Sequence, residues 1–266
     1  GFTDGAGDVP LPTDLAAGTT VGGALPVLLN RSVLELQEDL SVPVIVTATY
    51  TVDGAAASTT SRAETTLHRR TALVWDDSAK LASFVTPNEE VIAGFALRSL
   101  SSMNAAAADG DAEHLAALSH RVYRAMQLAD ALGSYGITYV EDPRSPFSEV
   151  QGRSTAVDTI RFPRTTLYYR SGDCDDTSAL LASLYEAAGL DTAIVTTPGH
   201  VMIAVDTREP VGNRWIYETG TTTMIEHAGT LWLPVETTIL DRGFPKAWES
   251  ASNLVSRHRD AGEVAA

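Results

Sequence analysis

The sequence predicts an α+β fold, in which an N-terminal β region and a helical connection precede a core of one helix packed on an antiparallel sheet. Residues 44–52 alternate between apolar side chains and mostly threonine, as in a half-buried strand. Apolar residues recur at steps of three and four over 111–132 and again over 177–188, as on the buried face of a helix. Strand-like segments follow at 192–196, 200–205, 214–217 and 231–235.

The composition divides the chain into three parts. Residues 1–24 are rich in Gly, Thr, Asp and Pro without an apolar period, which is typical of a flexible linker. Residues 25–86 form the N-terminal β region, for which we expect a small, sandwich-like β layer. Residues 87–266 hold the helical connection and the candidate catalytic core, with every motif that carries chemistry within 139–248.

Glycines mark the predicted ends of elements. Asp53-Gly54 can turn the chain after the first strand, ahead of what reads as a long loop. Gly133 is well placed to end the first helix, and Gly189 to end the second.

The charge balance excludes whole classes of partner. The chain carries 34 Asp and Glu against 19 Lys and Arg, for a formal net charge of −15. Such a surface repels the phosphates of nucleic acids and anionic lipid heads, so we expect no nucleic-acid partner. No stretch approaches the roughly 20 apolar residues of a membrane helix, so we also expect no membrane insertion. The oligomeric state stays open.

The termini and the cysteine count leave the compartment open. The only cysteine is Cys174, so no internal disulfide can form. The chain begins with Gly1 and no signal-like apolar run follows, which indicates a removed segment or a piece of a longer protein. An extracytoplasmic or cell-envelope location is favoured over the cytoplasm.

Cys174 is the candidate nucleophile. It stands in the run GDCDD, and the helical pattern that follows places it in the first turn of a helix, with Asp173 as the N-cap. Backbone N–H groups point outward there, and the positive end of the helix dipole favours a thiolate or an oxyanion. A lone cysteine is more often a small buried thiol. The polar helix start argues against that interpretation.

A histidine and a carboxylate are candidates to complete the site. His200 follows a Pro-Gly turn and opens the next strand, from which an imidazole can reach a thiol on a neighbouring helix. Glu218 and Glu236 each end a strand-like segment and compete as the group that orients the ring. Taken singly, such a histidine is more often structural and such glutamates are more often solvated.

The acids around the cysteine allow two interpretations. Asp173, Asp175 and Asp176 could ligate a hard cation such as calcium. We favour helix capping and dipole complementation, and we predict no metal or other cofactor. Negative charge beside Cys174 raises its pKa, so the histidine and the helix dipole must offset the acids.

Three side chains before the cysteine have candidate roles. Arg170 is close in sequence and could help to offset the acids. Tyr168 and Tyr169 could line the pocket or donate to the oxyanion, and core packing explains them equally well.

Three separated motifs together resemble the transglutaminase-like superfamily, and in particular its bacterial transglutaminase-like cysteine proteinase branch. They are the run from Phe162 through GDC to Ser178, the turn Pro198-Gly199-His200, and the segment 232–238, which matches W-x-P-[VL]-[DE]-x-T. The resemblance covers roughly 139–248 and implies a transglutaminase/papain-like core.

Carried over residue by residue, the resemblance implies Cys174 as nucleophile, His200 as base and Glu236 as orienting acid. It favours Glu236 over Glu218 because only Glu236 has the Trp and Pro before it. The family more commonly has Asp at this position, so the extra methylene leaves the placement of the carboxylate open. The implied activity is hydrolysis or acyl transfer at amide bonds of a protein or peptide substrate through a thioacyl intermediate, with hydrolysis favoured. The alternative is a non-catalytic binding or scaffold module that retains the fold.

Overall fold

The structure is a computed structural model that divides into two compact units, Gly1–Ala72 and Leu73–Ala266. The division falls earlier in the chain than the boundary expected at residue 86. None of the helices in the described part of the chain is long and apolar enough to cross a membrane. The residues described are 2–5, 7–8, 16, 18–24, 27–106, 119–142 and 156–259, without the side chains of 102–106.

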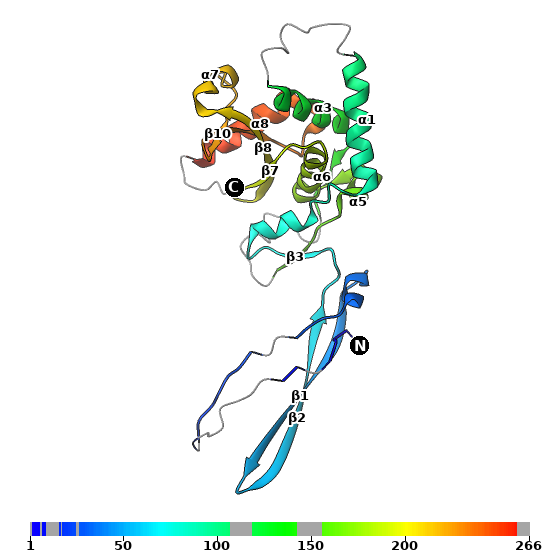
Figure 1. The fold of residues 1–266 in the computed structure, drawn as a ribbon, viewed down its shortest axis with the longest axis vertical. Helices are drawn as coiled ribbons and strands as arrows, with labels where there is room; N and C mark the ends of the chain where they lie inside the picture. The colour runs from blue at the N-terminus through cyan, green and yellow to red at the C-terminus, as the bar shows by residue number, and fades with distance from the viewer. Residues whose placement is uncertain are drawn as a thin grey trace. The chain divides into compact units, whose positions relative to one another are not determined.

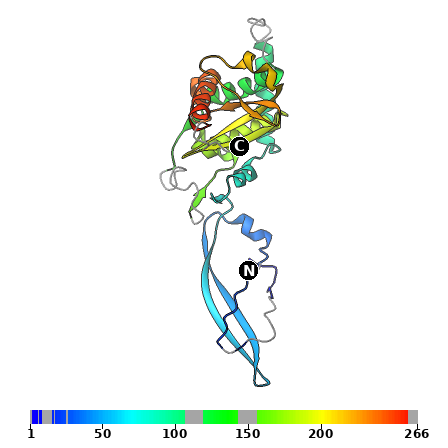
Figure 2. The same cartoon turned by 90° about the vertical axis from the view of Figure 1, so that its left-hand side faces the viewer.

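The first unit is built on one long β-hairpin (Figures 1 and 2). Its strands β1 (Leu40–Val52) and β2 (Ala55–Leu67) pair antiparallel over all 13 residues of each. Asp53 and Gly54 have φ values of 50° and 81°, so they form a tight two-residue turn. The 3₁₀ helix η1 (Arg31–Glu35) precedes the hairpin.

Two expectations for this region were wrong. No long loop follows the turn, because the small Ala, Ser and Thr side chains after it continue directly into β2. Among the described residues of this region, β1 and β2 make a sheet of two strands, so the small β layer is present but is not sandwich-like.

The second unit contains a four-stranded sheet in the order β7-β8-β10-β9, and its neighbouring strands pair antiparallel. Together with its helices, this sheet confirms the α+β class. Across the tight turn between β7 and β8, Thr197 pairs with His200, and on the other side of β8 Val235 pairs with Ile203. The strands are β7 (Thr192–Thr197), β8 (His200–Pro210), β9 (Ile225–His227) and β10 (Thr230–Val235).

Helices and short elements surround the sheet. The α-helices are α1 (Glu90–Ala106), α3 (His120–Tyr135), α5 (Pro163–Tyr169), α6 (Cys174–Ala187), α7 (Arg214–Tyr217) and α8 (Phe244–Arg259). The short strand pairs are β3 (Ala72–Val74) with β5 (Val157–Thr159), and β4 (Thr138–Tyr139) with β6 (Ser171–Gly172). The 3₁₀ helices are η2 (Ser78–Phe84), η4 (Val211–Asn213) and η5 (Leu240–Arg242).

The sheet is covered on both faces. Along β8, Ile203 and Val205 belong to the core that includes α6, whereas Met202 and Ala204 pack in a cluster with α8. On its other sides α6 contacts α1 and α3 (Figure 1). Every side chain from Cys174 to Tyr185 is buried, so α6 is a central helix whose N-terminus is firmly held.

Local predictions in this unit had mixed outcomes. The helix expected over 177–188 is confirmed as α6. The strand expected over 214–217 was wrong: these residues form α7, in which Arg214 pairs with Glu218 one turn later at 2.6 Å. The helix expected over 111–132 is described from His120 onwards, and residues 111–118 lie outside the described part.

Gly133 does not end α3, which continues to Tyr135 and is capped by Gly136 with φ 91°. Gly133 instead allows a close approach, since a Cβ there would lie 2.2 Å from the carbonyl oxygen of Leu240. The glycine was recognised in the sequence, but its role is packing between α3 and η5.

Candidate functional site

Cys174 is the first residue of α6. The Asp173 carboxylate accepts a hydrogen bond from the Asp176 N–H at 3.3 Å, which confirms it as the N-cap. The cysteine is only 4% exposed and belongs to an apolar cluster with Trp75 and Val201. The thiol therefore lies at a polar helix start and against an apolar wall at once.

The surroundings of the thiol keep it protonated. Burial raises the pKa of Cys174 to about 12, and the charges of Asp173 and Glu236 act in the same direction. The backbone N–H groups of Val201 and Asp175 interact with the sulfur and oppose this rise. Because Val201 directly follows His200, the sulfur is held beside the start of β8.

A partly buried His200 and a buried Glu236 form a hydrogen-bonded pair. They lie on neighbouring strands, His200 opening β8 and Glu236 following β10, and His200 Nε2 is 2.7 Å from Glu236 Oε2. The other carboxylate oxygen accepts from the Thr238 N–H at 3.0 Å and from its hydroxyl at 2.7 Å. Glu236 is 3% exposed; burial favours its neutral form, but the bonds from His200 and Thr238 outweigh this and hold its pKa below the usual value.

This geometry assigns roles to the two ring nitrogens. An ionised Glu236 can only accept, so Nε2 of His200 carries a hydrogen, and in the neutral ring Nδ1 is then the acceptor. Among the described residues, no hydrogen bond joins the Cys174 thiol to the His200 ring. The structure links the two through the Val201 backbone instead.

Buried hydroxyl groups connect α6 to the end of β10. Thr237 Oγ1 accepts from Thr177 at 3.0 Å and lies 2.9 Å from Ser178 Oγ. Ser178 also reaches the carbonyl of Val201 at 3.5 Å. These contacts hold the helix with the thiol, the strand with the histidine and the segment with the acid at fixed spacing. The sequence does not reveal these three hydroxyl contacts, because the partners lie on separate elements.

The three acids at the start of α6 are all buried and could together hold a hard cation. One carboxylate oxygen of each of Asp173, Asp175 and Asp176 lies within 4.8 Å of the others. Asp176 also accepts from the Arg161 N–H at 2.6 Å, and burial followed by the Asp173 charge raises its pKa to about 8. In the described part of the chain neither oxygen of Asp175 has a hydrogen-bond partner, and burial raises its pKa well above the ordinary value.

Tyr139 is a neighbour of the thiol that the sequence did not reveal. Its side chain is 42% exposed; its partial burial, followed by the charge of a Cys174 thiolate, raises its pKa to about 12. Its strand β4 pairs with β6, two residues before the cysteine. The tyrosines considered from sequence, Tyr168 and Tyr169, are 78% and 64% exposed and stack edge-to-face on each other.

Two other candidates have different partners. The Glu218 carboxylate binds Arg214 at 2.6 Å and the Thr223 hydroxyl at 2.9 Å. It therefore stabilises the loop after α7, and the carboxylate that binds His200 is that of Glu236. The Arg170 guanidinium lies 4.3 Å from the ring centroid of Tyr135, a cation–π contact.

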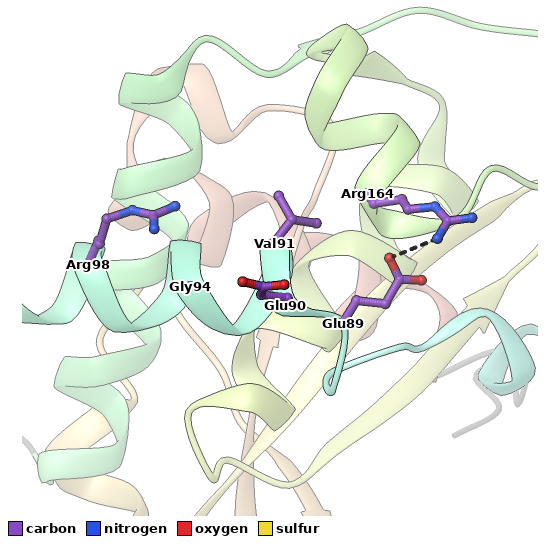
Figure 3. A pocket seen from close by; sticks show the side chains of 6 residues that line it. All are labelled: Glu89, Glu90, Val91, Gly94, Arg98 and Arg164. Carbon is purple, nitrogen blue, oxygen red and sulfur yellow. Dashed lines mark ion pairs between the residues drawn. The ribbon is translucent and has the colours of Figure 1, made fainter.

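A surface pocket lies at the start of α1 (Figure 3). Glu89 and Arg164 form an ion pair of 3.8 Å across it, and Arg98 lies further along the helix. None of the candidate catalytic residues lines this pocket.

No family model matches the chain, and no curated protein matches it. Among solved structures, the chain is similar to a "putative protease" from Parabacteroides distasonis ATCC 8503, with 11% identity and a TM-score of 0.32. The match covers 63% of this chain and 35% of that chain, so the chain spans about a third of that protein's length. This likeness is too weak to indicate a shared fold or function.

Proposed function

We propose that this chain is a cysteine-dependent hydrolase with a transglutaminase-like core, a peptidase or amidase that cleaves amide bonds in protein or peptide substrates. The observation that carries the proposal is the His200–Glu236 pair at 2.7 Å, adjacent to the Val201 N–H that interacts with the Cys174 sulfur. A thiol at a helix start, a base beside it and a carboxylate behind the base are the parts of a nucleophilic triad.

The proposed chemistry follows from the protonated thiol. As Cys174 attacks the substrate carbonyl, Nδ1 of His200 takes the thiol proton, and Glu236 stabilises the imidazolium. N–H groups at the start of α6 stabilise the tetrahedral oxyanion. The imidazolium then protonates the leaving amine, and water, deprotonated by His200, cleaves the thioester. We favour water over an amine because the motifs resemble the proteinase branch.

A non-catalytic module that retains the fold is the second candidate. It is favoured by the raised pKa of the thiol and by the lack of a hydrogen bond between Cys174 and His200 among the described residues. In that case the His200–Glu236 pair would serve only to hold β8 against β10.

Alkylation of Cys174 separates the two candidates. The chain has a single cysteine, so one added mass of carbamidomethyl reports this thiol alone. If His200 activates it, iodoacetamide reacts at near-neutral pH, and His200→Ala slows the reaction by at least about tenfold. A rate that rises tenfold per pH unit towards pH 12 and is the same in His200→Ala would contradict the catalytic proposal. His227→Ala, on β9, is the matched control.

A further inference from the structure

The segment that carries Glu236 begins where the strand ladder stops. The pairing of β10 with β8 ends at Val235, opposite Ile203. The next backbone N–H, that of Glu236, donates to the carbonyl of Ala247 on α8 at 3.2 Å and is therefore not part of that ladder. The placement of Glu236 and Thr237 relative to β8 and α6 thus depends on their side chains.

Thr237 is the side chain that joins this segment to α6. Apolar residues of β10 alternate in the core that includes α6, the last of them Val235, and Thr237 continues this alternation. Its hydroxyl oxygen lies 3.0 Å from that of Thr177 and 2.9 Å from that of Ser178. It also donates to the Cys174 carbonyl at 3.5 Å. All three partners belong to the first turns of α6, so Thr237 is fixed against the start of the helix that carries the thiol.

The three hydroxyl groups are buried together. Thr177, Ser178 and Thr237 are each at most 1% exposed. A buried hydroxyl that loses its partner cannot replace it with water, so the contacts hold their geometry. Because a rigid peptide bond joins Thr237 to Glu236, a shift of Thr237 displaces the Glu236 carboxylate and the His200 ring bound to it at 2.7 Å.

We propose that Thr237 is a positioning residue of the candidate site, whose hydroxyl sets the spacing at which the His200 ring takes the proton of the Cys174 thiol. This inference rests on the proposed cysteine-dependent function. Thr237 acts through Glu236 on one side and through α6 on the other. Proton transfer requires an accurate approach of the ring to the sulfur, and a misplacement of about 1 Å can cost on the order of 100-fold in rate.

Two substitutions at Thr237 test the proposal in the full chain. Each is made with and without His200→Ala, and alkylation of Cys174 by iodoacetamide at near-neutral pH gives the factor by which His200 accelerates the reaction. We expect a factor of at least about tenfold in the wild type. Thr237→Val has the same shape without the hydroxyl and should reduce the factor to less than about threefold. Thr237→Ser keeps the hydroxyl and should retain the wild-type factor to within about twofold.

Thr207→Val is the matched control. Thr207 is also a buried threonine, and its hydroxyl donates to the Leu231 carbonyl in the part of the β8–β10 pair away from His200. The control should lower the urea midpoint of unfolding, as Thr237→Val does, but leave the acceleration by His200 unchanged. If Thr237→Val does not fold, Ser178→Ala removes the hydroxyl at 2.9 Å instead and should reduce the acceleration at least about threefold.

The outcomes separate this inference from the proposed function. A loss of the acceleration in Thr237→Val that Thr237→Ser restores and Thr207→Val does not share supports the positioning role. An unchanged factor in a folded Thr237→Val, or an equal loss in Thr207→Val, would overturn that role and leave the proposed function intact. A wild-type chain whose alkylation rate His200→Ala does not change would overturn both.

Discussion

Glu236→Gln is the sharpest test of the proposed site, because it changes one atom that the His200 ring contacts. The amide oxygen of Gln can still accept from Thr238, so the segment after β10 keeps its local bonds. The amide NH₂ then faces Nε2 of His200, where a carboxylate oxygen lies at 2.7 Å in the native chain. An NH₂ donor favours the tautomer with the hydrogen on Nδ1, which is the nitrogen that must take the thiol proton.

The magnitude follows from the bond that is lost. A hydrogen bond to a buried charged group contributes roughly 1.5–3 kcal/mol, which corresponds to a rate loss of about 10- to 150-fold. The wrong tautomer adds to this loss. The assay follows the rate of Cys174 alkylation by iodoacetamide at near-neutral pH, read by intact-mass spectrometry. The midpoint of unfolding in urea is measured in parallel.

Glu218→Gln is the matched control, since Glu218 was the rival candidate and its carboxylate binds Arg214. We expect it to leave the alkylation rate unchanged. Equal rates in Glu236→Gln and the wild type, with both folded, would refute the role assigned to Glu236.

The remaining predictions concern stability and the pKa of the thiol. Gly133→Ala places a Cβ 2.2 Å from the Leu240 carbonyl oxygen, so it should lower the free energy of unfolding measured in urea by about 1–3 kcal/mol. Gly220→Ala is the control: it has open space around it and should change the free energy of unfolding by less than about 0.5 kcal/mol. Folding raises the pKa of Cys174 from 9.0 to about 12, so the folded state favours the protonated thiol. The free energy of unfolding is therefore unaffected by this group below pH 9 and falls as pH rises from 9 towards 12, by up to about 1.4 kcal/mol per pH unit. Cys174→Ser should remove that slope from urea midpoints measured at increasing pH. Asp173→Asn keeps an N-cap but removes a charge that raises the thiol pKa, so alkylation at fixed pH should become several-fold faster; an unchanged rate would show that this charge has little effect.

The elements that hold the site could be predicted because their signals are local. A capping Asp173, an apolar period and Gly189 define α6 within one stretch of sequence. The strands β7 and β8 likewise contain contiguous apolar residues on either side of a Pro-Gly turn. The position of Cys174 at the helix start depends on these signals alone.

The partners within the site depend on contacts between distant segments. Glu236 reaches His200 because β10 pairs with β8 across residues 211–229, and the spacing of the residues does not reveal this pairing. Only the resemblance chose between Glu236 and Glu218. Tyr139 lies near the thiol through the pairing of β4 with β6, each only two residues long, which is too short to leave a periodic signal.

The helix start at Cys174 has two opposing effects on the thiol. The helix dipole and the N–H groups favour a thiolate, as the sequence suggested. The residue that caps the helix is an aspartate, however, and its charge together with burial raises the pKa of the thiol. Capping and nucleophile activation therefore compete at the same turn. A thiol that is protonated at rest can react only while a base removes its proton, so any catalytic activity of this chain depends on His200 reaching the sulfur and on Glu236 holding the ring in the correct tautomer.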